Sequence, residues 1–181
     1  MAIKSTIFKA ELEVTDMDRN HYQDYQLTIA RHPSENDERM MVRLLAFALN
    51  GHEFLQFTKG LSSDDEPDIW QKSLNGEIDV WIDLGQPDEK RIRKACGRAK
   101  NVKIYTYQKG SGTAWWQQNK RKLDRFGNLT VVHFNETSVR DLALMVKRAM
   151  CLQCTIQDAA LWLSNGDQAI QLFPEIWKQA K

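Results

Sequence analysis

Residues 76–98 constrain the fold of this chain more than any other stretch of its sequence. Apolar side chains occupy every second position from residue 78 to 84, which is the side-chain period of a β-strand. Gly85 ends this strand, and Pro87 suits the first position of a helix whose apolar residues recur at spacings of three and four. Residues 102–107 form the next apolar stretch. The segment therefore predicts a strand–helix–strand unit with two parallel strands.

The second face of the predicted strand is acidic, because Glu77, Asp79 and Asp83 alternate with the apolar positions. Parallel sheets are usually covered on both faces, so these carboxylates are expected in a partly covered cleft. A buried carboxylate is costly unless it binds a cation or a basic side chain. The strand predicts either a functional acidic site or structural ion pairs. On an open antiparallel sheet the same acids would form an ordinary solvated surface.

The length of 181 residues is sufficient for one well-buried domain, and we expect a single domain over residues 1–181. The formal net charge of +1 gives no general indication of a polyanionic partner. The charge is unevenly distributed, however, since acidic residues dominate 62–88 and lysine and arginine dominate 89–109. This distribution fits a metal site beside a phosphate-binding surface, and it also fits alternating surface charge.

The three cysteines, Cys96, Cys151 and Cys154, are an odd number, and no secretory leader pattern opens the sequence. We therefore expect a protein of the reducing cytoplasm. Cys151 and Cys154 have the spacing of a zinc or redox pair, but no second pair accompanies them, so they are expected to be small side chains of a strand. No apolar run approaches the roughly 18 residues of a membrane span, so no membrane contact is expected.

The same period rules predict the elements on either side of the central unit. Residues 6–29 predict a hairpin with a long turn, and Ser34 is expected to cap a helix over 35–49. The other expected elements are strands at 52–58, 69–72 and 129–134, helices at 113–125 and 139–150, and a closing hairpin of 152–163 and 169–173 around Ser164-Asn165-Gly166-Asp167.

The predicted helix over 113–125 contains a Trp-Trp pair followed by the basic run Lys-Arg-Lys at 120–122. Aromatic side chains interleaved with cations can stack on and hold a single nucleic-acid strand. Alternatively, Trp116 and Leu123, which are seven residues apart, belong to the core and the cations form the solvated face of the helix. The sequence leaves both interpretations open.

Two aspartates have the placement of metal ligands. Asp68 follows Pro67 just before one expected strand, and Asp83 lies near the end of the central one. A hard cation such as Mg²⁺ prefers oxygen ligands and keeps several waters, so two carboxylates and a substrate phosphate would complete a site. The metal would lower the pKa of a bound water and offset charge that develops on phosphorus. The pair therefore predicts a candidate site for phosphodiester hydrolysis.

Several long motifs resemble those of the YaeQ protein family. They are ARHPSENDERMM at 30–41, DDEPD at 64–68, WIDLGQPDEKRIRKACGRA at 81–99, and the shorter TIQD at 155–158 with Trp-Leu at 162–163. The resemblance spans nearly the whole chain and indicates a bacterial-type protein. It implies an α/β fold (an α+β mixed sheet) with a restriction-endonuclease-like PD-(D/E)xK core and added N-terminal and C-terminal β-hairpins. That core consists of a helix, three strands, a helix and a strand.

The resemblance also implies roles for individual residues. Asp68 takes the place of the first acid of the nuclease motif and Asp83 that of the second, so both would bind Mg²⁺ or Mn²⁺. The motif has a lysine two residues after the second acid, where this chain has Gly85. In similar proteins the lysine moves to the following helix, where Lys90 and Lys94, one turn apart, are the candidates for a catalytic role. Lys94 also fits a solvated helix position.

Three further residues complete the expected site. Glu38 would supply the helix acid that such nucleases often use, although acids are common in the first turn of any helix. Arg91 and Arg98 would bind the phosphates of the substrate backbone. We therefore expect a magnesium-dependent nuclease-like phosphodiesterase that acts on nucleic acid.

Two alternatives to this expected activity remain. One is a non-catalytic protein that binds nucleic acid or the transcription machinery on a degenerate nuclease scaffold. The other is a scaffold without a polyanionic partner, in which the acids and bases of the sequence pair with each other.

Overall fold

The computed structural model describes residues 4–181 and shows a mixed α+β fold, as expected. The described part contains a five-stranded and a six-stranded mixed sheet together with four α-helices. Two compact units divide the chain, the first formed by Met1–Gly51 and Thr137–Pro174 and the second by His52–Glu136 and Glu175–Lys181. Among residues 4–181, no helix has the length and apolar character needed to cross a membrane.

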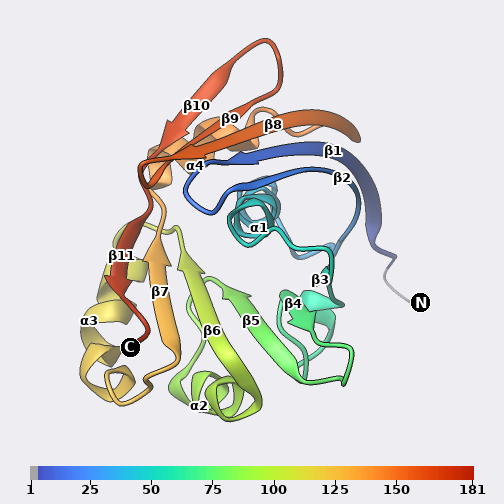
Figure 1. Cartoon of the computed structure of the whole chain (residues 1–181). Coiled ribbons are helices and arrows are strands. Elements are labelled where there is room, and N and C mark those ends of the chain that lie inside the picture. Colours follow the sequence, from blue (N-terminus) through green and yellow to red (C-terminus); the bar gives the residue numbers. More distant parts are fainter. Residues whose placement is uncertain (1–3) are drawn as a thin grey trace. The chain divides into compact units, whose positions relative to one another are not determined.

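The first unit is built on the five-stranded sheet (Figure 1). Its strand β1 (Thr6–Asp16) pairs antiparallel with β2 (His21–Arg31) and parallel with β8 (Ala149–Gln157). Strands β9 (Ala160–Ser164) and β10 (Ala169–Leu172) extend the sheet in antiparallel fashion. The expected N-terminal and C-terminal hairpins are therefore confirmed, and both belong to this sheet.

Helix α1 (Asp37–Leu49) packs beside β1, and all its side chains from Met40 to Ala48 are buried. The prediction that Ser34 caps this helix was wrong. The cap is Asn36, whose side chain accepts the N–H of Arg39 at 2.8 Å. The Ser34 hydroxyl instead lies 2.6 Å from a ring nitrogen of His32, because the chain is still in a turn at that point.

Two predicted elements near the end of the first unit were too long. Helix α4 (Glu136–Ala143) stops well before residue 150, because β8 already begins at Ala149. The expected strand over 152–163 is two strands, since Asp158 and Ala159 both have left-handed φ angles (52° and 60°) and reverse the chain between β8 and β9. Their amide N–H groups donate to the two carboxylate oxygens of Asp18, at 2.8 and 2.9 Å.

The second unit is built on the six-stranded sheet, whose spatial order is β11-β7-β6-β5-β4-β3. Strands β5, β6 and β7 are parallel to one another, whereas the β3–β4, β4–β5 and β7–β11 pairs are antiparallel. Its elements are β3 (Leu55–Phe57), a short 3-10 helix η1 (Gly60–Ser62), β4 (Ile69–Lys72), β5 (Ile78–Leu84), α2 (Glu89–Arg98), β6 (Ala99–Thr106), α3 (Ser111–Leu123), β7 (Leu129–His133) and β11 (Glu175–Lys178). The predicted strand–helix–strand unit is thus confirmed as β5, α2 and β6.

Three details of the second unit differ from the predictions. Pro87 does not start α2, because Asp88 is its cap and accepts the N–H of Arg91 at 2.7 Å. The alternation along β5 is interrupted by a bulge near its start, where the register to β4 shifts and Ile78 joins the same buried cluster as Trp81. Strand β11 was not predicted at all. Its side chains are exposed or only partly buried, so the sequence lacks the apolar period that identifies a strand.

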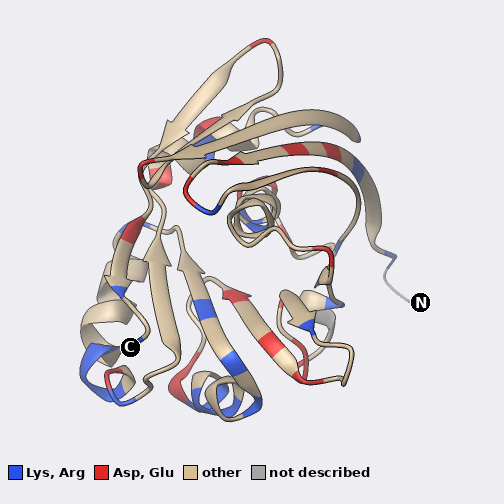
Figure 2. Cartoon of the chain, viewed as in Figure 1, with Lys and Arg blue, Asp and Glu red and all other residues tan. Residues whose placement is uncertain are grey.

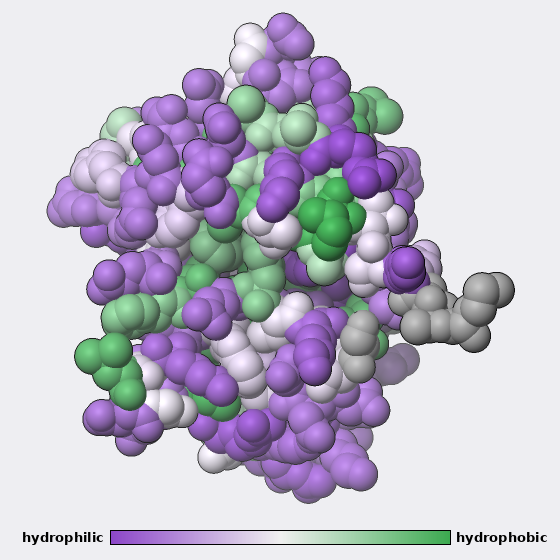
Figure 3. All heavy atoms as spheres, turned by 90° about the vertical axis from the view of Figure 1, so that its right-hand side faces the viewer, coloured by the Kyte–Doolittle hydropathy of each residue, from purple (hydrophilic) through white to green (hydrophobic). Residues whose placement is uncertain are grey.

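The face shown in Figure 3 is mostly hydrophilic, with apolar side chains between the polar ones. The large apolar side chains that are exposed come from many different elements, for example Ile7, Leu74, Leu144 and Phe173. The exposed apolar side chains named here therefore do not indicate a binding site by themselves, and the charged side chains are the stronger candidates.

Candidate functional site

Asp68 and Asp83 lie in neighbouring segments of the second unit. Asp68 immediately precedes β4, and its N–H donates to the carbonyl of Ile82 at 3.0 Å. Its carboxylate oxygen Oδ2 accepts the N–H of Leu84 at 2.9 Å. Asp68 is thus bonded to the residues on both sides of Asp83. Burial raises the pKa of Asp83, and the charge of Asp68 adds to this effect. The structure therefore brings the two predicted acids together, and both are buried.

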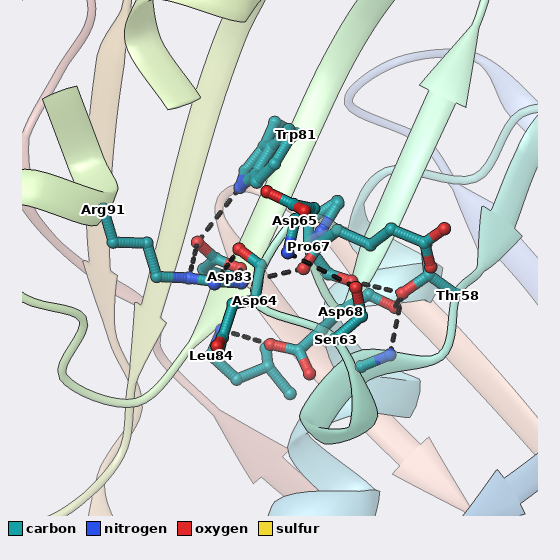
Figure 4. Close-up of polar contacts among 12 residues, drawn as sticks. Thr58, Ser63, Asp64, Asp65, Pro67, Asp68, Trp81, Asp83, Leu84 and Arg91 are labelled. Carbon is teal, nitrogen blue, oxygen red and sulfur yellow. Dashed lines mark hydrogen bonds and ion pairs between the residues drawn. The ribbon is translucent and has the colours of Figure 1, made fainter. Parts of the chain in front are cut away.

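The two carboxylates nevertheless bind different groups (Figure 4). The carboxylate of Asp83 faces Arg91, whose Nε and Nη2 lie 2.9 Å from Oδ2 and Oδ1, respectively. Trp81 Nε1 also donates to Asp83 Oδ2, at 3.0 Å. A guanidinium that binds both oxygens of a carboxylate forms the strongest common type of ion pair. Both oxygens that were expected to bind a metal therefore already have a cationic partner.

Arg91 connects three parts of the second unit. Its position in the first turn of α2 is fixed by the Asp88 cap. Beyond Asp83 on β5, its Nη1 donates to the carbonyl of Asp64 at 3.1 Å and its Nη2 to the carbonyl of Glu66 at 2.9 Å. The loop before β4 that contains residues 64–66, here called the acidic loop, therefore folds over this guanidinium and covers the ion pair.

Burial and charge have opposing effects within this pair. Burial raises the pKa of Asp83, while the hydrogen bonds from Arg91 and Trp81 act in the opposite direction. Burial also disfavours the charge of Arg91, but the hydrogen bonds and the charge of Asp83 outweigh this and raise the pKa of Arg91. The guanidinium is therefore charged at any ordinary pH, and it provides the positive charge that a buried carboxylate requires.

Asp68 is enclosed by the loop that joins β3 to β4. Thr58 Oγ1 donates to the carbonyl of Pro67 and accepts the N–H of Gly60 at 3.0 Å. Gly60 has a φ of +52°, and a Cβ at this position would lie 3.3 Å from Asp68 Oδ1. The loop therefore needs glycine at position 60, both for its backbone conformation and for its close approach to the carboxylate.

Gly85 stands where the nuclease motif expected from the sequence has a lysine. It has a φ of +88°, a backbone conformation that residues other than glycine rarely adopt. Its N–H donates to the carbonyl of Tyr105 at 2.8 Å. A lysine here would strain the turn that leads from β5 to α2. The backbone itself, and not only the residue identity, therefore departs from the motif.

The remaining predicted residues lie outside the carboxylate pair. On α2, Lys94 forms an ion pair with the exposed Asp65, and Lys90 is exposed. Arg98 donates to the carbonyl of Asp65 at 2.9 Å, and its guanidinium lies 5.1 Å from the ring centroid of Trp81. Two of these three cations thus hold the acidic loop, and their predicted roles in catalysis or phosphate binding stay predictions.

Glu38 is half-buried on α1 of the first unit, and its role as helix acid also stays a prediction. Three contributors to the site were not predicted from the sequence: Thr58, Gly60 and Trp81. Only Trp81 had a usable signal, because it lies two residues before Asp83 on the same strand and therefore on the same face. The contacts of Thr58 and Gly60 depend on a loop path that no periodic pattern predicts.

A divalent cation does not fit the carboxylates as they are arranged. Both oxygens of Asp83 are bound by Arg91, and Asp68 Oδ2 is bound by a backbone amide. Within residues 4–181 no group of three or more His, Cys, Asp or Glu side chains has an arrangement that could hold a metal ion. The geometry describes two neighbouring buried acids, of which Asp83 is neutralised by the protein's own Arg91.

The fold and the site define an α+β protein of two mixed sheets in which strand β5 carries a buried aspartate, Asp83, bound by Arg91. The chain belongs to the YaeQ protein family, whose model matches residues 1–174. It is 46% identical over 179 residues to the YaeQ protein of Escherichia coli, and the match covers 99% of both chains.

Two solved structures have the same fold. The crystal structure of the YaeQ protein from Xanthomonas axonopodis pv. citri has a TM-score of 0.94 and 41% identity, and the match covers 96% of this chain and 98% of that one. The structure of the YaeQ protein from Pseudomonas syringae has a TM-score of 0.92 and 32% identity, and the match covers 97% of each chain.

Proposed function

We propose that this protein binds nucleic acid on a nuclease-like scaffold and does not cleave it. The observation on which the proposal depends is the bidentate ion pair between Arg91 and Asp83. In a metal-dependent nuclease the second acid of the motif must be available to a divalent cation. Here a guanidinium occupies both of its oxygens, so the acid serves to fix α2 and the acidic loop.

The order of elements supports a nuclease-like ancestry. The chain runs α1, β3, β4, β5, α2 and β6, and this order matches the helix, three strands, helix and strand expected of a PD-(D/E)xK core. Asp68 and Asp83 occupy the expected places in that order, whereas the turn at Gly85 excludes the motif lysine. The order of elements is thus consistent with a nuclease-like fold. The Arg91-bound Asp83 and the glycine in place of the motif lysine are not consistent with metal-dependent cleavage.

The charges that remain exposed favour a polyanionic partner. Figure 2 shows lysine and arginine along the outer part of α2 and at the C-terminal end of α3. Lys90, Arg93, Lys120 and Arg121 are all exposed. Exposed cations on neighbouring helices bind phosphates without sequence preference, and such binding depends steeply on salt.

Fluorescence anisotropy with labelled single- and double-stranded DNA and RNA tests this proposal. We expect binding that weakens steeply as salt is raised and that is unchanged by EDTA, since no metal takes part. Binding that is insensitive to salt, or that requires Mg²⁺ or Mn²⁺, would contradict the proposal.

A second candidate is metal-dependent phosphodiester hydrolysis, as the sequence predicted. The adjacency of Asp68 and Asp83 and the electrostatic coupling between them favour it. It requires that Arg91 leave Asp83, so that the Asp83 carboxylate could join Asp68 in binding Mg²⁺ or Mn²⁺. The predicted cation at the reaction centre would be Lys94 or Lys90, and Glu38 would be an additional acid.

Calorimetric titration of Mn²⁺ separates the two candidates. We expect no binding heat with the wild-type protein. Saturable binding to the wild-type protein that disappears in Asp83→Asn would favour the hydrolase, and so would cleavage of DNA or RNA by the wild-type protein but not by Asp83→Asn. Equal cleavage by both proteins would indicate a contaminating nuclease.

A further inference from the structure

A cavity of about 390 Å³ opens on the second unit, away from the carboxylate pair. Helix α3 and strand β11 form its walls. Its lining combines two tryptophans with three cations and one carboxylate: Trp116, Lys120, Arg121, Asp124, Trp177 and Lys178. A volume of a few hundred Å³ is typical of small-ligand sites.

The aromatic wall of this cavity is held in place by stacking and by a bulge. Trp177 lies on β11 where the register to β7 shifts, between Ile176 and Lys178. A bulge of this kind redirects a side chain away from the regular sheet position. The Trp177 ring stacks on His133, with a centroid distance of 4.4 Å, and lies 5.9 Å from the ring of Trp116. The two indoles are therefore a fixed apolar surface at the edge of the sheet.

The polar wall is predominantly cationic. Lys120 and Arg121 are exposed on the last turn of α3, one turn after Trp116. Lys178 is held deeper, because its Nζ donates to the carbonyls of Phe126 at 2.8 Å and Leu129 at 3.2 Å. Burial lowers the pKa of Lys178, and the charge of Asp124 acts in the opposite direction. Two exposed cations and one hydrogen-bonded cation thus line the cavity beside the indoles, together with the carboxylate of Asp124.

We propose that this cavity binds one nucleotide of a single-stranded nucleic acid, with the base against Trp116 and Trp177 and the phosphate on Lys120 and Arg121. The inference rests on the proposed function and names the site and the form of the nucleic acid. Indole surfaces stack with any base, and adjacent cations bind the backbone. In a duplex the bases are stacked on each other, so only an unpaired base can stack on these indoles.

A matched pair of variants tests the phosphate contact. Lys120→Gln removes a cation that lines the cavity, whereas Lys122→Gln removes one from the same exposed turn that does not line it. Both variants lose the same charge and keep a good helix former. With labelled oligothymidylate we expect Lys120→Gln to weaken binding by about fivefold and to reduce the salt slope by about 0.7, and Lys122→Gln to weaken it by less than about twofold. Equal effects of the two variants would overturn the proposed site.

Crosslinking tests the aromatic contact without any substitution. An oligonucleotide that contains 5-iodouracil is irradiated with the wild-type protein, and the attached peptides are identified by mass spectrometry. We expect attachment at Trp116 or Trp177, and competition by unlabelled single strand but not by duplex. Attachment elsewhere, for example on α2, would contradict the site. If a free nucleotide competes as effectively as the single strand, the cavity is a mononucleotide pocket. This result would overturn the proposal that it binds single-stranded nucleic acid.

The outcomes for the site and for the proposed function can be separated. If no nucleic acid binds the wild-type protein at low salt, the proposed function and this inference both fail. If single strands bind but Lys120→Gln behaves like Lys122→Gln and no crosslink forms at Trp116 or Trp177, the proposed function stands and only this site is wrong. A preference for duplex over single strand would likewise leave the proposed function standing and show that this site is wrong.

Discussion

Arg91 binds both carboxylate oxygens of Asp83, each at 2.9 Å, and so places an internal cation on the acid that the sequence had assigned to a metal. The pair connects the first turn of α2 to β5, and the acidic loop before β4 closes over it through two carbonyls. Removing one member of such a pair leaves the other charge buried without its partner.

Arg91→Ala is expected to lower the free energy of unfolding by about 3 kcal/mol, because Asp83 is then buried without a counter-charge. Urea denaturation followed by tryptophan fluorescence measures this. Arg93→Ala is the matched control, since Arg93 is exposed on the same helix, and it should change stability by less than about 0.5 kcal/mol. The double variant Arg91→Ala with Asp83→Asn should recover part of the loss. A loss in Arg91→Ala no larger than in the control would refute the role given to the ion pair.

The stability of the protein should fall as the pH drops below about 6.5, in part because of His133. Burial against Trp177 lowers the pKa of His133, although the charges of Glu175 and Glu136 oppose this. Between its lowered pKa and its ordinary value, the unfolded chain binds the proton more readily than the folded one, so stability rises with pH in that window. His133→Gln should flatten the dependence of unfolding free energy on pH from 5 to 7.5. An unchanged slope would show that other groups dominate.

Thiol reagents should label Cys151 first, because it is exposed whereas Cys154 is buried. Burial raises the pKa of Cys96 to about 11 and that of Cys154 to about 12, so both should react slowly at pH 7.5. Cys151 is itself restrained, since its hydrogen bond to Glu11 raises its pKa.

Glu11→Gln should therefore speed the reaction of Cys151 several-fold, as measured with a chromogenic disulfide at pH 7.5. Glu13→Gln, on the same strand, is the control and should leave the rate unchanged. Similar acceleration by both variants would point to general surface charge rather than to the hydrogen bond.

Ala159→Gly should stabilise the protein by about 0.5 kcal/mol, because Ala159 has a left-handed φ of 60° that costs a non-glycine residue about 1 kcal/mol. The greater flexibility of glycine in the unfolded chain offsets part of this gain. Ala149→Gly, at an exposed position of β8 with ordinary φ, should instead destabilise by about 0.5 kcal/mol. Thermal unfolding of the two variants should therefore shift in opposite directions, and equal losses in both would show that the turn is not strained.

The sequence by itself determined most of the regular elements. The alternation before Gly85 and the three- and four-residue spacing after it predicted β5 and α2, because these periods follow from backbone geometry alone. The prediction failed where a neighbouring segment decides the outcome. The strand expected over 152–163 is broken by a turn that Asp18 stabilises from 140 residues away, and no local pattern contains that contact. Strand β11 forms because β7 offers an edge, and not because of its own sequence.

The candidate site shows the same division. The sequence placed Asp68 and Asp83 on neighbouring strands and put a basic helix beside them, since both follow from the order of elements along the chain. Which cation reaches Asp83 depended on the rotation of α2, on its start at Asp88 and on the path of the acidic loop, and these are fixed only by tertiary packing. The sequence therefore determined that acids and bases meet, and the tertiary structure decided that they meet as the Arg91–Asp83 ion pair.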